Sequence, residues 1–445
     1  MTSLRRTAPG PDPAPRAGRA DSLNTPAMRR ILASSFIGSL IEYYDFLLYA
    51  TAAAIVFQDV FFAGAGAGVA AFASFGTLAA GYAARPVGGA IFGHFGDRLG
   101  RKNVLVVSMV TMGVATCLIG LLPTTAQIGV AAPVLLVVLR IVQGLAVGGE
   151  WGGAMLVGLE HAPGGRRGFA ASFANMGAPA GATLATLVVS ACTLLPEDDF
   201  MSWGWRIPFL LSVALVSVGL VVRLKVAETP LFQELQDTAE KRRLPLVEVL
   251  TRHPKNLALG ILAGTSVYTL AGIVTVWAVS HAVDAGADKT GVLNAKAAAA
   301  AVMIPVVIVS ARLSDRVGRR PVMLAGMIAA ALAAYPILWL ADTGTVWGFA
   351  GAVVLGQALQ GVIFGPFGAF TAELFPTRMR YTGASLTYQT ASTLGAGFTP
   401  AIAAALVVGG GLPLLGGIWI LAFAAAGAAL LLTREGRTRD LTAIG

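Results

Sequence analysis

The chain has 445 residues, of which 56% are hydrophobic and only 12% are charged, and its formal net charge is +9. A soluble protein carries roughly twice that fraction of charge, so the composition excludes an ordinary soluble enzyme and indicates a membrane protein. The two cysteines and four histidines match no metal-ligand spacing, which predicts that the chain binds no metal and needs no cofactor.

The first 28 residues are rich in Pro, Arg and Ala, and no short apolar core with a cleavage site follows them. They predict a disordered cytoplasmic tail rather than a signal peptide. Apolar runs of about 20 residues, the length needed to cross a bilayer, fill most of the remaining chain. We therefore expect an all-α polytopic membrane protein with twelve transmembrane helices, over residues 31–57, 67–92, 103–122, 131–157, 168–195, 203–223, 256–281, 291–311, 321–341, 346–370, 382–408 and 412–432.

The loops between these runs differ in charge. If the N-terminus lies inside, the inside loops hold most of the arginines, and the outside loops hold acidic residues such as the run 197–199, with Lys289 as the clear exception. Cytoplasmic loops of membrane proteins are enriched in Lys and Arg. This distribution predicts that both termini are cytoplasmic, and the arginine-rich composition favours the cytoplasmic membrane of a bacterium.

Three motifs recur in the same order about 215 residues apart. Asp97-Arg98 with Arg101 returns as Asp315-Arg316 with Arg319, Gln143-Gly144 returns as Gln360-Gly361, and Glu160 with Arg167 returns as Glu373 with Arg380. The repeat predicts two six-helix pseudo-repeats, residues 29–224 and 256–433, joined by a cytoplasmic linker (225–255) and followed by a cytoplasmic tail (434–445). Six-helix halves repeated in parallel orientation are typical of the major facilitator fold.

Two carboxylates, Glu42 and Asp45, lie in the middle of the first predicted span. Spaced three residues apart, they share one face of the helix, next to Tyr43 and Tyr44. An ionised carboxylate in hydrocarbon costs about 2.5–3.5 kcal/mol, so such residues normally face an aqueous cavity. We predict that at least one of them carries a coupling proton; the alternative is a structural carboxylate paired to an arginine.

Arg140 lies within the fourth predicted span and offers bidentate donors to a carboxylate. It is our candidate for binding an anionic substrate group or for pairing with Glu42 or Asp45, and a permanent structural ion pair is the alternative. Further candidates for substrate binding, each of which could equally hold helices together, are Tyr43, Tyr44, Gln143, Trp277, Gln360, Tyr388 and Gln389.

The segment GHFGDRLGRK (93–102) is predicted to form a short cytoplasmic loop whose Asp97 accepts hydrogen bonds from helix N-termini and whose Arg101 bridges to a carboxylate. Arg85 and Glu150 have similar depth and could pair in the same gate, Glu160 could pair with Arg166 or Arg167, and Glu373 with Arg378 or Arg380. The full set of predicted gate residues is Arg85, Asp97, Arg98, Arg101, Glu150, Glu160, Arg167, Asp315, Arg319, Glu373 and Arg380.

The stretches IEYYDFLLYATAAAIVF (41–57), LRIVQGLAVGGEWGGA (139–154) and AELFPTRMRYTGASLTYQTASTLGAGFTP (372–400) are similar to the metabolite:proton symporter branch of the major facilitator superfamily. Within that branch, the segment around Tyr388 and Gln389 most resembles shikimate transporters. The resemblance implies a secondary active transporter, not an enzyme, that imports a small organic acid with protons by alternating access. Betaine or osmolyte uptake, proton-coupled efflux and a transporter-like sensor remain alternatives. The expected partners are a small-molecule substrate, protons and the lipid bilayer, with no nucleic acid, and we expect a monomer.

Overall fold

The structure is a computed structural model that describes residues 26–437 apart from 65, 100, 149–154, 157, 160, 161, 163, 164, 226–244, 377 and 378. The side chains of 93–99 and 101–105 also lie outside the description. The described residues form helices and short connections, with no strand among them. The predicted tail (1–28) and linker (225–255) therefore fall largely outside the described part, although α1 already begins at Pro26 and α12 (Pro245–Arg252) lies in the linker range.

Residues 26–225, called here the N-terminal half, contain six long helices with short helical turns between them. The long helices are α1 (Pro26–Ile55), α3 (Ala67–Leu99), α4 (Arg101–Leu121), α6 (Ala131–Val147), α8 (Arg167–Cys192) and α10 (Ile207–Lys225). The short ones are α2 (Phe57–Phe61), α5 (Thr125–Ile128), α9 (Glu197–Ser202) and the 3-10 turn η1 (Gly204–Arg206). Long apolar sequences adopt helices in lipid because a helix satisfies every backbone hydrogen bond within the segment.

Residues 245–437, called here the C-terminal half, begin with α12. Its other helices are α13 (Pro254–Ala271), α14 (Ala278–Asp284), α15 (Lys289–Val317), α16 (Arg319–Leu332), α17 (Ala334–Ala341), α18 (Val346–Glu373), α19 (Arg380–Ser392) and α20 (Thr399–Leu432). Two π-helical turns, η2 (Gly272–Trp277) and η4 (Thr393–Gly397), continue α13 and α19 and contact each other. Such turns are uncommon and often mark functional sites.

Within the described residues, each predicted span falls on one of these helices or on consecutive helices joined by a short turn. The spans 382–408 and 412–432 share α20, which is broken at Gly411, where φ is 70° and ψ is −174°. A positive φ is readily adopted only by glycine, so this residue separates the two segments. By length and apolar composition alone, six helices of the described residues could cross a membrane, or seven if α16 and α17, which meet at a 50° bend, form one span.

At both copies of the repeated charged motif, the connection between the two helices is shorter than the sequence predicted. The sequence predicted that 93–102 forms a loop, but α3 extends to Leu99 and α4 begins at Arg101, so almost all of the motif is helical. In the second copy, α15 ends at Val317 and α16 begins at Arg319, with Gly318 at φ 111° between them. The charged motif residues therefore lie on helix ends, which the sequence alone did not show.

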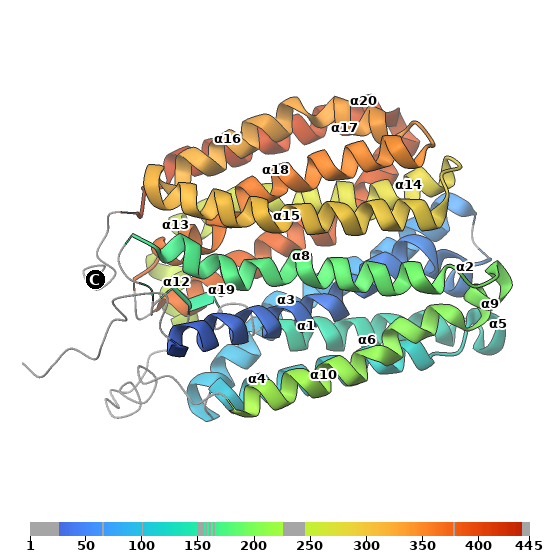
Figure 1. The fold of residues 1–445 in the computed structure, drawn as a ribbon, viewed down its shortest axis with the longest axis horizontal. Helices are drawn as coiled ribbons and strands as arrows, with labels where there is room; N and C mark the ends of the chain where they lie inside the picture. The colour runs from blue at the N-terminus through green and yellow to red at the C-terminus, as the bar shows by residue number, and fades with distance from the viewer. Residues whose placement is uncertain are drawn as a thin grey trace, which may run out of the picture.

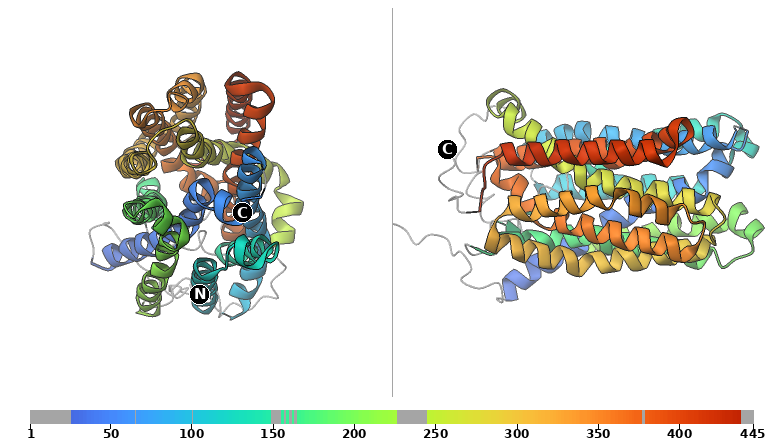
Figure 2. Two further views of the ribbon diagram at one scale, coloured as in Figure 1. Left: turned by 90° about the vertical axis from the view of Figure 1, so that its right-hand side faces the viewer. Right: turned by 90° about the horizontal axis from the view of Figure 1, so that it is seen from above.

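The long helices run side by side along the long axis of the molecule (Figure 1). The start of α1, α12 and the C-terminal segment lie at one end, called here the terminal end, whereas α2, α5 and α9 lie at the opposite end, called here the far end. Viewed from the far end and from above, the two halves lie against each other along their length (Figure 2).

Small residues allow these helices to approach closely. At Gly177 an added Cβ would lie 2.3 Å from Cβ of Ser39, and at Gly181 it would lie 2.6 Å from the carbonyl oxygen of Leu40. Both glycines place α8 directly against α1. In the C-terminal half, a Cβ at Gly365 would clash with Ser310. Small residues at such contacts are typical of helices packed in lipid.

Candidate functional site

Arg140 lies in α6 and is completely buried in the N-terminal half. Its guanidinium carbon is 4.0 Å from the ring centroids of both Phe46 and Tyr49 in α1. One terminal nitrogen donates to Oε1 of Gln143 at 2.5 Å, while Nε and the other terminal nitrogen have no hydrogen-bond partner among the described residues. The predicted ion pair of Arg140 with Glu42 or Asp45 is therefore not seen in the described structure.

A glycine makes room for this arginine. At Gly81 in α3, an added Cβ would lie 2.4 Å from Nε of Arg140 and 2.7 Å from its Cγ. Any larger side chain at position 81 would displace the guanidinium from between the two rings. The pocket that holds Arg140 is thus built by α1, α3 and α6 together.

Asp45, also completely buried, faces the interior of the N-terminal half. Its Oδ1 accepts a hydrogen bond of 2.5 Å from the hydroxyl of Ser212 in α10. Gln143 donates from Nε2 to Oγ1 of Thr116 in α4 at 2.8 Å, and Thr116 donates in turn to the carbonyl of Met112 at 2.9 Å. The hydrogen bonds that start at Arg140 therefore end on the backbone of α4, whereas Asp45 is held separately by Ser212.

Glu42 has different neighbours from Asp45, although both lie in α1. It is buried and interacts electrostatically with Arg85 of α3. The Arg85 guanidinium lies over the rings of Phe46 at 4.7 Å, Tyr82 at 5.2 Å and Tyr388 at 5.8 Å. Phe46 therefore separates two guanidinium groups, and the two predicted proton carriers occupy distinct environments.

The predicted substrate-binding residues on α1 and α19 divide into two groups. Tyr43 and Tyr388 join their hydroxyls across the two halves, and Nε2 of Gln389 donates to the carbonyl of Gly148 at 2.9 Å. These residues lie where the halves meet. Tyr44, in contrast, donates to the carbonyl of Pro208 at 2.9 Å and faces α10 within its own half.

The two remaining candidates are buried in the C-terminal half. The ring of Trp277, in η2, stacks on His281, with the centroids 4.7 Å apart. His281 is joined to Asp342 at 2.8 Å, which ties Trp277 to the far-end connections of its own half. Gln360 is buried in the middle of α18.

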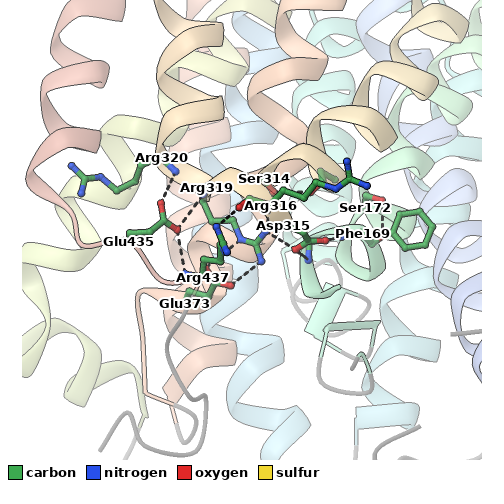
Figure 3. Close-up of polar contacts among 12 residues, drawn as sticks. Phe169, Ser172, Ser314, Asp315, Arg316, Arg319, Arg320, Glu373, Glu435 and Arg437 are labelled. Carbon is green, nitrogen blue, oxygen red and sulfur yellow. Dashed lines mark hydrogen bonds and ion pairs between the residues drawn. The ribbon is translucent and has the colours of Figure 1, made fainter. Parts of the chain in front are cut away.

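A cluster of charges closes the terminal end (Figure 3). Asp315 accepts from the backbone N–H groups of Gly168 and Phe169, both at 2.9 Å, at the N-terminus of α8. Arg319 is paired with Asp315 at 2.6 Å and with Glu373 at 3.2 Å. The sequence analysis predicted that Glu373 pairs with Arg378 or Arg380, whereas its ion-pair partner in the described structure is Arg319.

The other predicted gate residues are only partly visible. The side chains of Asp97, Arg98 and Arg101, and the whole of Glu150 and Glu160, lie outside the described residues. Arg167 is buried at the start of α8, and Nε of Arg380 donates to the carbonyl of Ala372 at 3.0 Å. The proposed pairs Arg85–Glu150 and Glu160–Arg167 therefore stay predictions.

The halves also meet at the far end. Nζ of Lys289 lies 2.8 Å from Oε1 of Glu197, in a pair whose Glu197 side chain is largely exposed. The remaining contacts are neutral hydrogen bonds, Ser190 to Asn294 at 2.6 Å, Thr193 to Thr290 at 2.9 Å and Gln58 to Ser280 at 3.1 Å. Among the described residues, the halves therefore contact each other at both ends and in the middle.

Several residues of the site were not predicted from the sequence. Phe46 and Tyr49 follow Glu42 by four and seven residues, so helical spacing could have placed them near its face. Thr116, Ser212 and Gly81 carry no such signal, because a single small residue in an apolar span is most often a packing residue.

Residues 35–400 match the family model of the Major Facilitator Superfamily. The chain belongs to the major facilitator superfamily. This transporter is 42% identical to the inner membrane metabolite transport protein YhjE of Escherichia coli strain K12 over 430 residues, which cover 93% of this chain and 95% of the relative.

A second relative carries a substrate in its name. The shikimate transporter of the same strain is 39% identical over 395 residues, which are 87% of this chain and 89% of that protein. The solved structure of the proton:xylose symporter XylE of Escherichia coli aligns with a TM-score of 0.72 over 94% of this chain and 98% of that one, at 16% identity. This likeness confirms the predicted all-α major facilitator fold, and the relatives are transporters rather than enzymes.

Proposed function

We propose that this transporter takes up a small organic acid, such as shikimate or a related carboxylate, together with one or more protons. The observation that carries the proposal is the environment of Arg140. It is a fully buried guanidinium with two unused donor nitrogens among the described residues, and the buried carboxylate of Asp45 lies in the same half of the molecule.

Arg140 suits the binding of an anion. A guanidinium presents parallel donors that match a carboxylate in a bidentate arrangement, and such charge-assisted bonds are stronger than neutral ones. A buried charge without a counterion is costly, and a substrate carboxylate would supply that counterion. The rings of Phe46 and Tyr49 hold the guanidinium from both sides, so its position is set before the substrate arrives.

Asp45 or Glu42 is the proposed proton carrier. A buried carboxylate can exist as the neutral acid or as the anion, so protonation of Asp45 changes the net charge inside the half that also holds Arg140. Glu42 acts instead on Arg85, at the tyrosines that join the two halves. In either case the proton and the substrate anion bind close to the same set of arginines, which couples one to the other.

Alternating access requires that the contacts at one end break while those at the other end hold. In this fold the two halves rock against each other around a central site. By the excess of arginine in its loops we assign the terminal end to the cytoplasm of a bacterium, with both chain termini on that side. Nothing in this cycle requires more than one copy of the chain.

Betaine uptake is the second candidate, and the site suits it less well. Quaternary ammonium groups are recognised by the faces of aromatic rings. Here the faces of Phe46, Tyr49 and Tyr82 are already occupied by the guanidinium groups of Arg85 and Arg140. A cationic ligand at these rings would meet like charge.

Uptake into proteoliposomes tests the proposal. The purified protein is reconstituted and given labelled shikimate, other small carboxylates or glycine betaine, with and without an inward proton gradient. We expect the gradient to drive accumulation of at least one carboxylate, and a protonophore to abolish it. Accumulation of betaine alone would favour osmolyte uptake instead. Release of preloaded acid driven by the inward proton gradient would favour proton-coupled efflux.

A further inference from the structure

A buried lysine in the C-terminal half has no role in the mechanism above. Lys296 lies two turns into α15 from its far end, inside an apolar run, and its exposed fraction is only 4%. Charged residues within membrane-spanning helices are rare, and they normally face a cavity or a partner. The same rule that singled out Glu42 and Asp45 therefore applies to Lys296.

The contacts of Lys296 leave most of its hydrogen-bonding capacity unused. Nζ donates to Oγ1 of Thr51 at 2.9 Å, and that hydroxyl donates in turn to the carbonyl of Leu47 at 3.0 Å. An ammonium group has three donors. Among the described residues, no carboxylate lies within ion-pair distance of Lys296, whereas Lys289 in the same helix is paired with Glu197.

Lys296 also joins the two halves. Its own helix, α15, belongs to the C-terminal half, and Thr51 belongs to α1, the helix that carries Glu42 and Asp45. Thr51 follows Asp45 by six residues, about 9 Å along the axis toward the far end. The ammonium therefore lies between the halves, on the far-end side of the carboxylates in α1.

A pocket opens at the far end, one turn of α1 beyond the Thr51 that contacts this lysine. It has a volume of about 430 Å³ and is lined in part by Ala54 and Gln58, which follow Thr51 along α1. Its charged groups are Asp59, Asp284 and Lys289, which do not form an anion site on their own. Lys296 lies deeper along α15 than Lys289 and, among the described residues, has no carboxylate partner.

We propose that Lys296 is a second anion-binding residue, which contacts the carboxylate of the substrate from the C-terminal half. The inference rests on the proposed function and extends it, because Arg140 lies in the N-terminal half and Lys296 in the other. A buried ammonium without a counterion is strongly unfavourable, and a carboxylate ligand removes this penalty. An anion held between the two halves also draws them together.

Binding of shikimate and of its uncharged methyl ester to the purified full-length protein tests this assignment. We expect Lys296→Met to weaken binding of the acid roughly 10- to 100-fold, the usual effect of losing a hydrogen bond to a charged group, and to reduce the preference for acid over ester by the same factor, because Arg140 remains. Lys296→Arg keeps the charge and should retain most of the affinity. Lys255→Met, at an exposed lysine at the start of α13, is the matched control and should leave binding unchanged.

A purely structural role for Lys296 gives a different result. Thr51→Val removes the hydroxyl contact but keeps the ammonium, so we expect it to preserve binding of the acid. If Thr51→Val weakened binding as much as Lys296→Met, or if Lys296→Met bound the acid like the wild type, the anion site would be ruled out. If the wild type bound neither shikimate nor any other small carboxylate, the proposed function itself would fail, and the anion site with it.

Discussion

Arg140 shows how a membrane protein can hold a charge ready for a ligand. Its guanidinium is fixed between two rings of α1, and Gly81 of α3 leaves the space for it. A cation stacked on aromatic faces is stabilised by about 0.5–2 kcal/mol per ring, which partly offsets its burial. The hydrogen-bond donors of the same group remain available for a carboxylate.

Replacing Arg140 with Lys should therefore impair binding without unfolding the protein. An ammonium keeps the charge but cannot form the bidentate fork or fill the gap between the rings. We expect substrate affinity to fall by roughly 10- to 100-fold, measured by calorimetry on the purified variant. Arg252→Lys, in the exposed i,i+4 pair with Glu248, is the control. Wild-type affinity in Arg140→Lys would remove this residue from the site.

The sequence was informative about single residues only where their type is rare in lipid. Glu42, Asp45 and Arg140 stood out because charges are costly in a span. Their partners did not, because the choice of Gln143, Thr116 and Ser212 as neighbours depends on how α1, α4, α6 and α10 pack, and that packing is not encoded in any local pattern. Lys296 is also a charged residue in an apolar span, like Glu42, but it was not among the site residues predicted from the sequence.

At the scale of elements, the apolar runs predicted the helices well and their ends less well. Length and hydropathy fix where a helix must lie in the bilayer, but they do not fix its last turns. The repeated charged motif reads as a loop because it is polar, yet Gly318 turns the chain within one residue and leaves Asp315 and Arg319 on helix ends. This placement lets Asp315 reach the N-terminus of α8.

Removing that contact should open the terminal end. Asp315→Ala takes away the acceptor for two N–H groups of α8 and one partner of Arg319. Compared with the protein that keeps Asp315, we expect longer distances between spin labels at positions 166 and 317. These distances are measured by pulsed electron paramagnetic resonance after Cys117 and Cys192 have been replaced. The same labels on an Asp342→Ala background, at the opposite end, serve as the control. An unchanged distance distribution would show that Asp315 does not hold this end closed.

The C-terminal segment supports the same cluster (Figure 3). Burial raises the pKa of Glu435, but hydrogen bonds from the backbone N–H groups of Arg320, Arg319 and Arg437 lower it by more. The pKa of Glu435 therefore lies below the ordinary glutamate value. A carboxylate whose pKa is lowered by folding stabilises the protein above its unfolded pKa, roughly 4.3, and this contribution is lost as the pH falls through the folded value.

Glu435→Gln should accordingly destabilise the protein at neutral pH. A carboxylate at a helix N-terminus contributes about 0.3–1 kcal/mol, so we expect a small decrease in the unfolding temperature in detergent at pH 7. Below about pH 4 the difference from the wild type should shrink, because Glu435 is then protonated in the unfolded chain. A difference that stays constant with pH would mean that the charge of Glu435 contributes nothing.

At the scale of the whole molecule, the two ends are closed by different chemistry. At the terminal end the N–H groups of Gly168 and Phe169 donate across the halves to Asp315, a nearly inaccessible carboxylate that Arg319 holds from within the C-terminal half. The far end is held by neutral hydrogen bonds and by the partly exposed pair Lys289–Glu197. Exposed ion pairs contribute only about 0–1 kcal/mol. Among the described residues, the terminal end is thus joined through a buried carboxylate, and the far end through neutral groups and an exposed ion pair.

In the proposed transport cycle, the substrate carboxylate and the proton cross the membrane together. The direct test is the pH inside proteoliposomes loaded with a fluorescent pH indicator, recorded when shikimate or another transported acid is added outside. We expect the interior to acidify with the wild type, and Asp45→Asn or Glu42→Gln to abolish acidification while leaving exchange of labelled substrate intact. Substrate entry without any acidification in the wild type would contradict proton coupling.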